Sequence, residues 1–168
     1  APAAAQSAAA GGAAAPAADF RTEFLGQFDA SAAKLVALAE AMPAERFDWR
    51  PAEGVASVAE AYTHIAHYNY LYPREGLRAA VPAGVDLGVL GGLSGKVEVV
   101  DALRASLEHV RTTVSGMSDA DLEAPARLYG RDITRWAVLF QLITHMNEHL
   151  GQEIAYARMN GVVPPWSR

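Results

Sequence analysis

His145 and His149 stand four residues apart in the longest helical pattern of the chain. On an α-helix this spacing places two side chains one turn apart, about 40° apart around the axis, with Cβ atoms about 6 Å apart. Both imidazoles can therefore reach one metal ion, although two histidines that only cap a polar face would share the spacing. The segment is not an H-E-x-x-H zinc-protease motif, because Glu148 precedes the second histidine instead of following the first.

A metal site that does chemistry commonly has three protein ligands and an open position, so a third donor is needed. His64 is the candidate, because a helical wheel of residues 58–80 places it at the edge of the apolar face. His67 falls about 60° away on the polar side. We interpret His67 and His109 as solvated histidines, the latter because charged residues flank it.

Neutral polar residues share the helix faces that carry these histidines. Gln152 and Tyr156 lie on the stripe of the C-terminal pair, and Tyr68 lies one turn from His64. Such a stripe suits the wall of a partly enclosed site, whereas a surface helix would carry charge there. We expect the three residues to line the site, with hydrogen bonds to the distal ring nitrogens fixing the tautomers. An ordinary polar surface position is the alternative for Gln152.

Three neutral imidazoles can hold a divalent ion such as Zn²⁺, Ni²⁺ or Fe²⁺ and leave positions for water. The ion would either lower the pKa of a bound water toward ~7 for hydrolysis or bind a thiol as thiolate for transfer to an electrophile. No carboxylate stands out as a general base, and Glu153, one turn beyond His149, is the nearest candidate. The chain has no cysteine, so its ligands must be nitrogen or oxygen atoms. The expected substrate is a small molecule of unknown identity.

Four long amphipathic segments must position these residues, and none shows strand alternation. They span residues 18–42, 58–80, 96–117 and 134–160. We predict an all-α four-helix bundle with long connections, at least one of which crosses the bundle. The glycine-rich connection at 81–96 is long enough to be a lid or a substrate-facing segment. The connection at 118–132 contains a possible short extended turn at 127–131.

Local signals place the helix ends and the buried faces. Asp19 is placed as one N-cap, and Ser57 with Glu60 forms a capping box. Pro73 is expected to kink or end the second helix near Tyr72. On the last helix the wheel assigns these residues to the core: Trp136, Leu139, Phe140, Ile143, Leu150, Ile154 and Ala157.

The first 18 residues are almost entirely alanine, glycine and proline. We predict a disordered tether over residues 1–18, ahead of one domain at 19–168. The small-residue start at Ala1 suggests a removed secretory leader, which favours a periplasmic or secreted protein. A chain trimmed for another reason, from a cytoplasmic protein, is the alternative. The net charge of −5 without a basic cluster argues against nucleic-acid binding, and no apolar run is long enough for membrane insertion.

Residues 20–167 resemble the DinB-like superfamily, which includes YfiT-type metal-dependent hydrolases and bacterial thiol-dependent transferases. The resemblance rests on these motifs: WRP at 49–51, Gly54, SVAE at 57–60, HIA at 64–66, HMNEHLGQEI at 145–154, Arg158 and GVVPP at 161–165. The three metal-binding histidines of the family fall on His64, His145 and His149. The resemblance implies a four-helix bundle and a divalent metal without choosing an activity.

A rival hypothesis is a non-catalytic helical module that binds a partner or a second copy. Members of the family often pair through bundle faces, which implies a possible homodimer. Tyr68, Tyr70 and Tyr72 are the candidates for such an association face.

Overall fold

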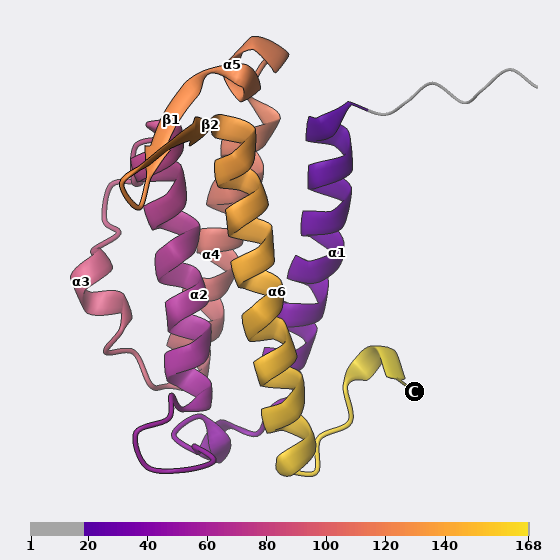
Figure 1. The fold of residues 1–168 in the computed structure, drawn as a ribbon. Helices are drawn as coiled ribbons and strands as arrows, with labels where there is room; N and C mark the ends of the chain where they lie inside the picture. The colour runs from indigo at the N-terminus through magenta and orange to yellow at the C-terminus, as the bar shows by residue number, and fades with distance from the viewer. Residues whose placement is uncertain (1–18, 168) are drawn as a thin grey trace, which may run out of the picture.

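The computed structural model describes residues 19–167. Its four long helices are α1 (Phe20–Ala41), α2 (Val58–Tyr72), α4 (Lys96–Ser115) and α6 (Arg135–Met159), and they form one bundle (Figure 1). The predicted all-α four-helix bundle is therefore confirmed. The predicted tether at 1–18 lies outside the described residues.

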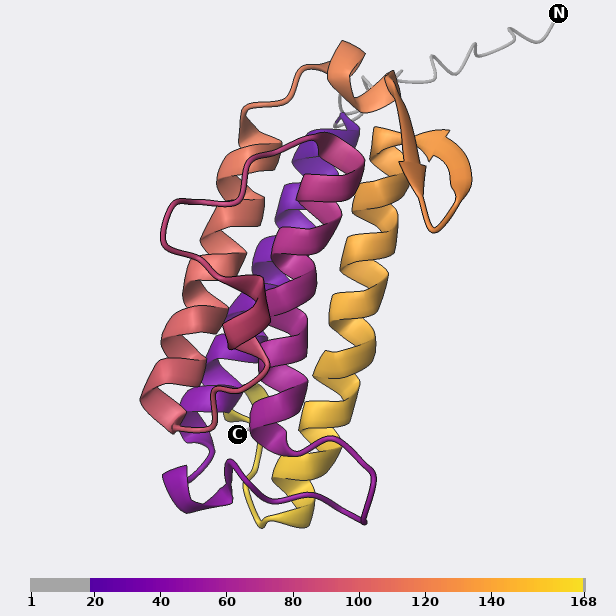
Figure 2. The same ribbon diagram turned by 90° about the vertical axis from the view of Figure 1, so that its left-hand side faces the viewer.

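The long helices form a four-cornered bundle in which α1 and α2 each pack against both α4 and α6. In Figure 1, α1 and α6 run downward while α2 and α4 run upward. The neighbours α2 and α4 are thus parallel, and a long connection must return along the whole bundle between them. That connection carries the short helix α3 (Leu87–Leu90) along the outside of the bundle (Figure 2). The predicted crossing connection is present.

The helix ends follow the local signals. The Asp19 side chain accepts a hydrogen bond of 2.8 Å from the backbone N–H of Thr22, and Ser57 and Glu60 form a reciprocal capping box. The α-helical part of α2 ends at Tyr72, where Pro73 was expected to kink or end it, and does not reach residue 80. Pro73, which lacks an N–H and cannot continue the α-helical ladder, begins the single π-helical turn η2 (Pro73–Leu77).

The connection between α4 and α6 contains regular structure that the sequence only partly indicated. Helix α5 (Asp119–Glu123) leads into an antiparallel hairpin of β1 (Pro125–Leu128) and β2 (Arg131–Thr134). The two turn residues, Tyr129 and Gly130, have positive φ angles of 51° and 76°. The extended turn predicted at 127–131 is the end of this hairpin, and its strands are too short to show clear alternation.

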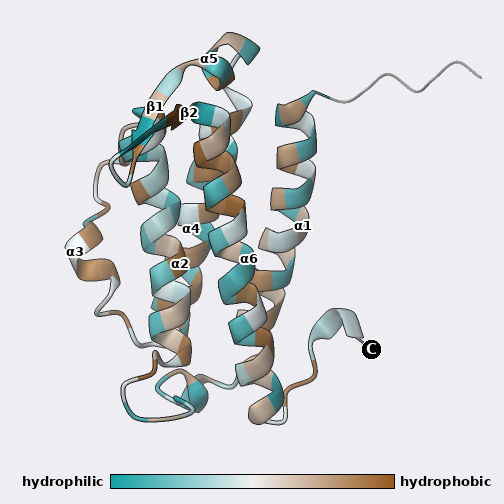
Figure 3. Cartoon of the chain, in the orientation of Figure 1, coloured by the Kyte–Doolittle hydropathy of each residue, from teal (hydrophilic) through white to brown (hydrophobic). Residues whose placement is uncertain are grey.

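The core lies between the four long helices, and the wheel of the last helix is wrong in part. Trp136 and Phe140 were assigned to the core but are 39% and 62% exposed, whereas Leu142 and Met146 are buried. Figure 3 shows hydrophobic and hydrophilic residues interleaved along α6, so its apolar face has no sharp edge. Trp136 instead packs edge-on against Phe20 at the end of the bundle.

In the part of the chain that the structure describes, no helix has both the length and the apolar character needed to cross a membrane.

Candidate metal centre

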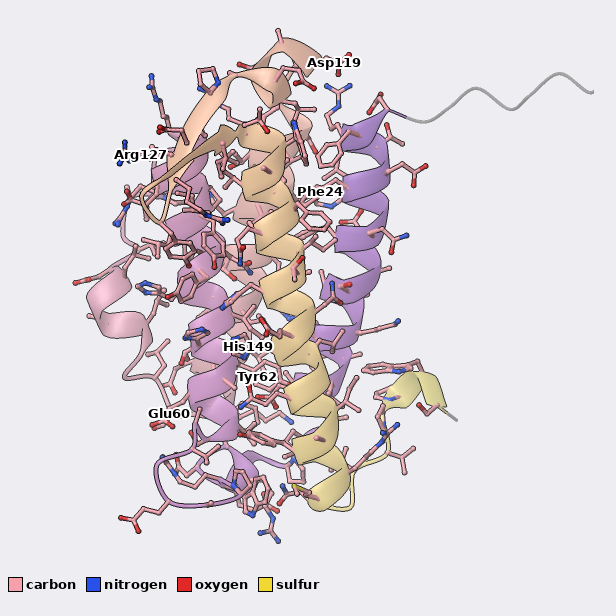
Figure 4. All side chains as sticks on the ribbon, in the orientation of Figure 1. Phe24, Glu60, Tyr62, Asp119, Arg127 and His149 are labelled. Carbon is pink, nitrogen blue, oxygen red and sulfur yellow. The ribbon has the colours of Figure 1, made fainter. Side chains whose placement is uncertain are left out.

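Three histidines from two helices meet in the seam between α2 and α6. His64 comes from α2, His145 and His149 come from α6, and one ring nitrogen of each lies within 4.8 Å of the others. The Nε2 atoms of His64 and His145 are 3.0 Å apart. Two donors that each sit about 2 Å from one ion are at most about 4 Å apart, so this pair fits a shared ion. Figure 4 shows His149 in the same seam.

Burial keeps these rings in the form that binds metal. His145 and His149 are half-buried, and His64 is the most accessible of the three. Burial, together with smaller repulsion from His149 and His64, lowers the pKa of His145 to about 4. Burial also lowers the pKa of His64, with smaller contributions from His149 and His67. At neutral pH both rings are therefore neutral and carry a free lone pair.

A chain of hydrogen bonds fixes the orientation of His149. Its Nδ1 lies 2.8 Å from Oε1 of Gln152, whose Nε2 donates to the Tyr156 hydroxyl at 2.7 Å. That hydroxyl donates in turn to the backbone carbonyl of Ala56 at 3.0 Å. Because the chain ends on a carbonyl, each link has one direction, and His149 must carry its proton on Nδ1. The opposite nitrogen, Nε2, is then the metal-binding atom.

Aromatic rings cover the other side of the histidine cluster. The Tyr68 ring centroid lies 4.6 Å from those of His64 and His145. Tyr72, which is buried, stands edge-on to His145 at 5.6 Å. Its hydroxyl is 2.8 Å from that of Tyr129 in the hairpin turn. Burial raises the pKa of Tyr68, and it raises that of Tyr72 further, so both phenols stay protonated at neutral pH.

One member of the cluster, His64, lines a cavity of about 360 Å³ between α2 and α3. Its lining combines residues of both helices: Glu60, Thr63, His64, His67, Tyr68, Leu87, Gly88 and Gly91. The glycine-rich connection, predicted as a lid or substrate-facing segment, thus supplies one wall of this cavity. Glu60 lines the cavity, but it also caps α2 and pairs with Arg50.

The sequence profile of the DinB superfamily matches residues 27–152, which is most of the chain. The chain belongs to the DinB superfamily. Among curated proteins, none matches the chain.

Solved structures share the DinB fold at low sequence identity. A DinB-like protein from Bacillus cereus is 19% identical, with a TM-score of 0.74 over 86% of this chain and 95% of that one. YfiT from Bacillus subtilis, reported as a probable metal-dependent hydrolase with an unusual four-helix bundle topology, is 17% identical. Its TM-score is 0.65 over 85% of this chain and 89% of its own.

A mycothiol-dependent maleylpyruvate isomerase is 12% identical, with a TM-score of 0.61. The match covers 77% of this chain and 59% of the isomerase. The TM-scores show that these proteins share a fold, and at identities this low they show the fold alone.

The structure does not bring Glu153, the predicted general-base candidate, to the histidines of this DinB protein. Glu153 is 1% exposed, interacts with the Tyr62 side chain of α2, and is outside the donor cluster. Burial raises the pKa of its carboxyl group well above the usual value, so the group is neutral. The physical reason is helical drift: each step of four residues turns the side chain by about 40°, which carries Glu153 from the site stripe into the core.

The remaining predicted residues fall in three places. Gln152 lies against His149, and Tyr68 lies against His64. Tyr156 lies behind Gln152 and is connected to His149 only through the Gln152 side chain. The interpretation of His109 as exposed is wrong, because the ring is half-buried against Tyr70.

The proposed association face is also wrong in part. Tyr70 and Tyr72 are only 2% and 1% exposed, so they present no surface to a second chain. Tyr68, Tyr70 and Tyr72 are two residues apart, and on a helix each such step turns the side chain by about 200°, so the three rings do not share a face. Sequence reasoning missed the site contacts of Tyr72 and the position of Tyr129. The one signal for Tyr129 was an aromatic residue directly before a glycine in a turn.

Proposed function

We propose that this DinB-superfamily protein is a divalent-metal-dependent hydrolase that acts on a small molecule. The observation that carries the proposal is the convergence of His64, His145 and His149, of which His64 also lines a cavity. An ion in such a site leaves coordination positions free and lowers the pKa of bound water toward ~7. The shared fold of YfiT, reported as a probable metal-dependent hydrolase, supports this reading.

The side chains around the triad prepare it for an ion. Gln152 holds His149 in the tautomer whose Nε2 is free, and burial keeps the His145 ring neutral. The Tyr68 ring packs at a tilt against two of the three imidazole rings and restricts their rotation. Leu87 and the glycines of α3 leave room for a substrate beside His64. Zn²⁺, Ni²⁺ and Fe²⁺ all accept three imidazole ligands, so each of them suits the site.

A second candidate, metal-dependent thiol transfer, is favoured by one feature of the site. Among residues 19–167, no carboxylate joins the three-histidine donor cluster, and Glu153 is buried and neutral. Hydrolysis commonly uses a general base, whereas a thiol bound as thiolate has already lost its proton. The mycothiol-dependent maleylpyruvate isomerase also has this fold.

The experiment that separates these functions uses protein purified without a histidine tag and loaded with Zn²⁺, Ni²⁺ or Fe²⁺. Hydrolysis of a panel of p-nitrophenyl esters and anilides is measured beside thiol addition to 1-chloro-2,4-dinitrobenzene. We expect ester or amide hydrolysis that requires the ion and is lost in His145→Ala but kept in His109→Gln. Thiol addition without hydrolysis would establish the second function. An ion bound with neither reaction would overturn both in favour of a non-catalytic binding module.

A further inference from the structure

The β1–β2 turn places an unusual residue in a left-handed conformation. Tyr129 has φ of 51°, and the following Gly130 has φ of 76°. Two-residue hairpin turns of this kind favour asparagine, aspartate or glycine at the first position, and a bulky side chain there is an outlier. Backbone strain of this sort is concentrated at functional sites. The strained turn therefore points to a function for the Tyr129 phenol.

That phenol reaches from the hairpin toward the histidine cluster. The Tyr129 hydroxyl lies 2.8 Å from that of Tyr72, and the Tyr72 ring centroid lies 5.0 Å from that of Tyr68. Tyr68 in turn lies against His64 and His145. Tyr72 is buried, whereas Tyr129 is 60% exposed, so Tyr72 anchors a hydroxyl that solvent and ligands can reach.

The hydroxyl groups of Tyr68, Tyr72 and Tyr129 have more protons than the hydrogen bond between them uses. A hydrogen bond between the hydroxyls of Tyr72 and Tyr129 uses one of their two protons. When Tyr72 donates this hydrogen bond, the proton of Tyr129 remains for a ligand, and Tyr68 can supply a second. Two phenol donors beside each other match the two oxygens of a carboxylate, which accepts hydrogen bonds but donates none.

The charge of the surroundings favours the same ligand. Three neutral imidazoles would leave the charge of a divalent ion uncompensated, and the donor cluster of the described chain includes no carboxylate. The acid that lines the cavity, Glu60, is already paired with Arg50 and bonded to the backbone N–H of Ser57. A negatively charged oxygen ligand is thus favoured over a cation.

We propose that Tyr129 and Tyr68 bind a carboxylate group of the substrate beside the metal site, with Tyr72 as the positioning residue that holds Tyr129. The inference rests on the proposed function in one respect, because the ion supplies the positive charge. It deepens that function by naming the substrate class: a molecule that carries a carboxylate near the bond that reacts. The β1–β2 hairpin is then part of the substrate site.

The test uses the full chain loaded with Co²⁺, whose visible spectrum reports ligands that arrive at or near the ion. Benzoate is titrated into the wild type and into Tyr129→Phe, Tyr68→Phe and the matched control Tyr70→Phe, with sodium chloride as the ionic control. A hydrogen bond to a charged group is strong, so we expect Tyr129→Phe and Tyr68→Phe to weaken benzoate binding about tenfold or more. Co²⁺ affinity and the Tyr70→Phe titration should match the wild type.

Tyr129→Asn separates a binding role from a structural one. Asparagine suits the left-handed turn, so the melting temperature of this variant should equal or exceed that of the wild type. If Tyr129 binds the carboxylate, benzoate affinity nevertheless falls as far as in Tyr129→Phe. Wild-type benzoate affinity in Tyr129→Asn and Tyr129→Phe, or no benzoate binding by Co²⁺-loaded wild type, would overturn the inference. Failure of the wild type to bind Co²⁺ would instead overturn the proposed function on which it rests.

Discussion

Nδ1 of His149 lies 2.8 Å from Oε1 of Gln152, so an amide on the next helical turn determines which nitrogen of the imidazole faces the metal site. Outer contacts of this kind typically change metal affinity by 10–100-fold. We predict that Gln152→Leu lowers Zn²⁺ affinity within about that range while the fold is kept, because the ring loses its acceptor. Competition titration with a chromophoric chelator measures the effect. Gln152→Glu, which keeps an acceptor, should bind Zn²⁺ at least as well as the wild type, and equal affinities in all three proteins would refute the role of Gln152.

The buried carboxyl group of Glu153 gives the fold a pH dependence of its own. Burial raises the pKa of Glu153 above its unfolded value, so the folded state holds a proton that the unfolded state releases. Its contribution to stability is present below the unfolded pKa and is lost as the pH rises through the folded pKa. Glu153→Gln should therefore raise the melting temperature most at alkaline pH and least near pH 4.5. If the difference in melting temperature between the two proteins stays constant from pH 4.5 to 9, the prediction is wrong.

The histidine cluster acts in the opposite direction in metal-free protein. The pKa of His145 is lowered to about 4 in the folded state. Between about pH 6.5 and 4 its ring is therefore protonated in the unfolded state and neutral in the folded state. Stability should fall as the pH is lowered through this window. Chemical denaturation in the Glu153→Gln background isolates the trend, because the acid with the opposite dependence is absent. A further change, His145→Gln, should flatten the profile, and an unchanged slope would show that another group causes it.

Two glycines provide a matched test of how closely η2 approaches α6. A Cβ at Gly76 would lie 2.6 Å from both γ carbons of Val138, whereas a Cβ at Gly26 meets nothing within 4 Å. We predict that Gly76→Ala destabilises the protein by about 1–3 kcal/mol through overpacking. Gly26→Ala should stabilise it by about 0.5–1 kcal/mol, because alanine loses less backbone entropy in a helix. Urea denaturation of both variants measures the change in the free energy of unfolding. Equal changes in the two variants would mean that the close packing is absent in solution.

Features encoded by local spacing could be predicted from the sequence. The i, i+4 pair and the position of His64 at the edge of an apolar stripe identified the three rings that the structure brings together. The caps at Asp19 and Ser57 depend only on the next three residues and were found for the same reason. Motifs on both site helices predicted that the chain belongs to the DinB superfamily.

Features that depend on distant residues could not be predicted in this way. Tyr129 meets Tyr72 across 57 positions of sequence, and nothing local marks that pairing. Glu153 was misplaced because an i+4 stripe drifts around the helix and enters the core after two steps. Phe140 was assigned to the core but is exposed, and Leu142, which was not assigned to the core, is buried, because α6 carries apolar residues on more than one side.

The central claim is that His64, His145 and His149 share one divalent ion. The most direct test is metal analysis of protein purified without a histidine tag and equilibrated with Zn²⁺, Ni²⁺ or Fe²⁺. We predict one ion per chain in the wild type and in His109→Gln, and none in His64→Ala or His149→Ala, with helical content unchanged in all four. An ion retained at wild-type affinity in His64→Ala, or no stoichiometric ion in the wild type, would contradict the claim.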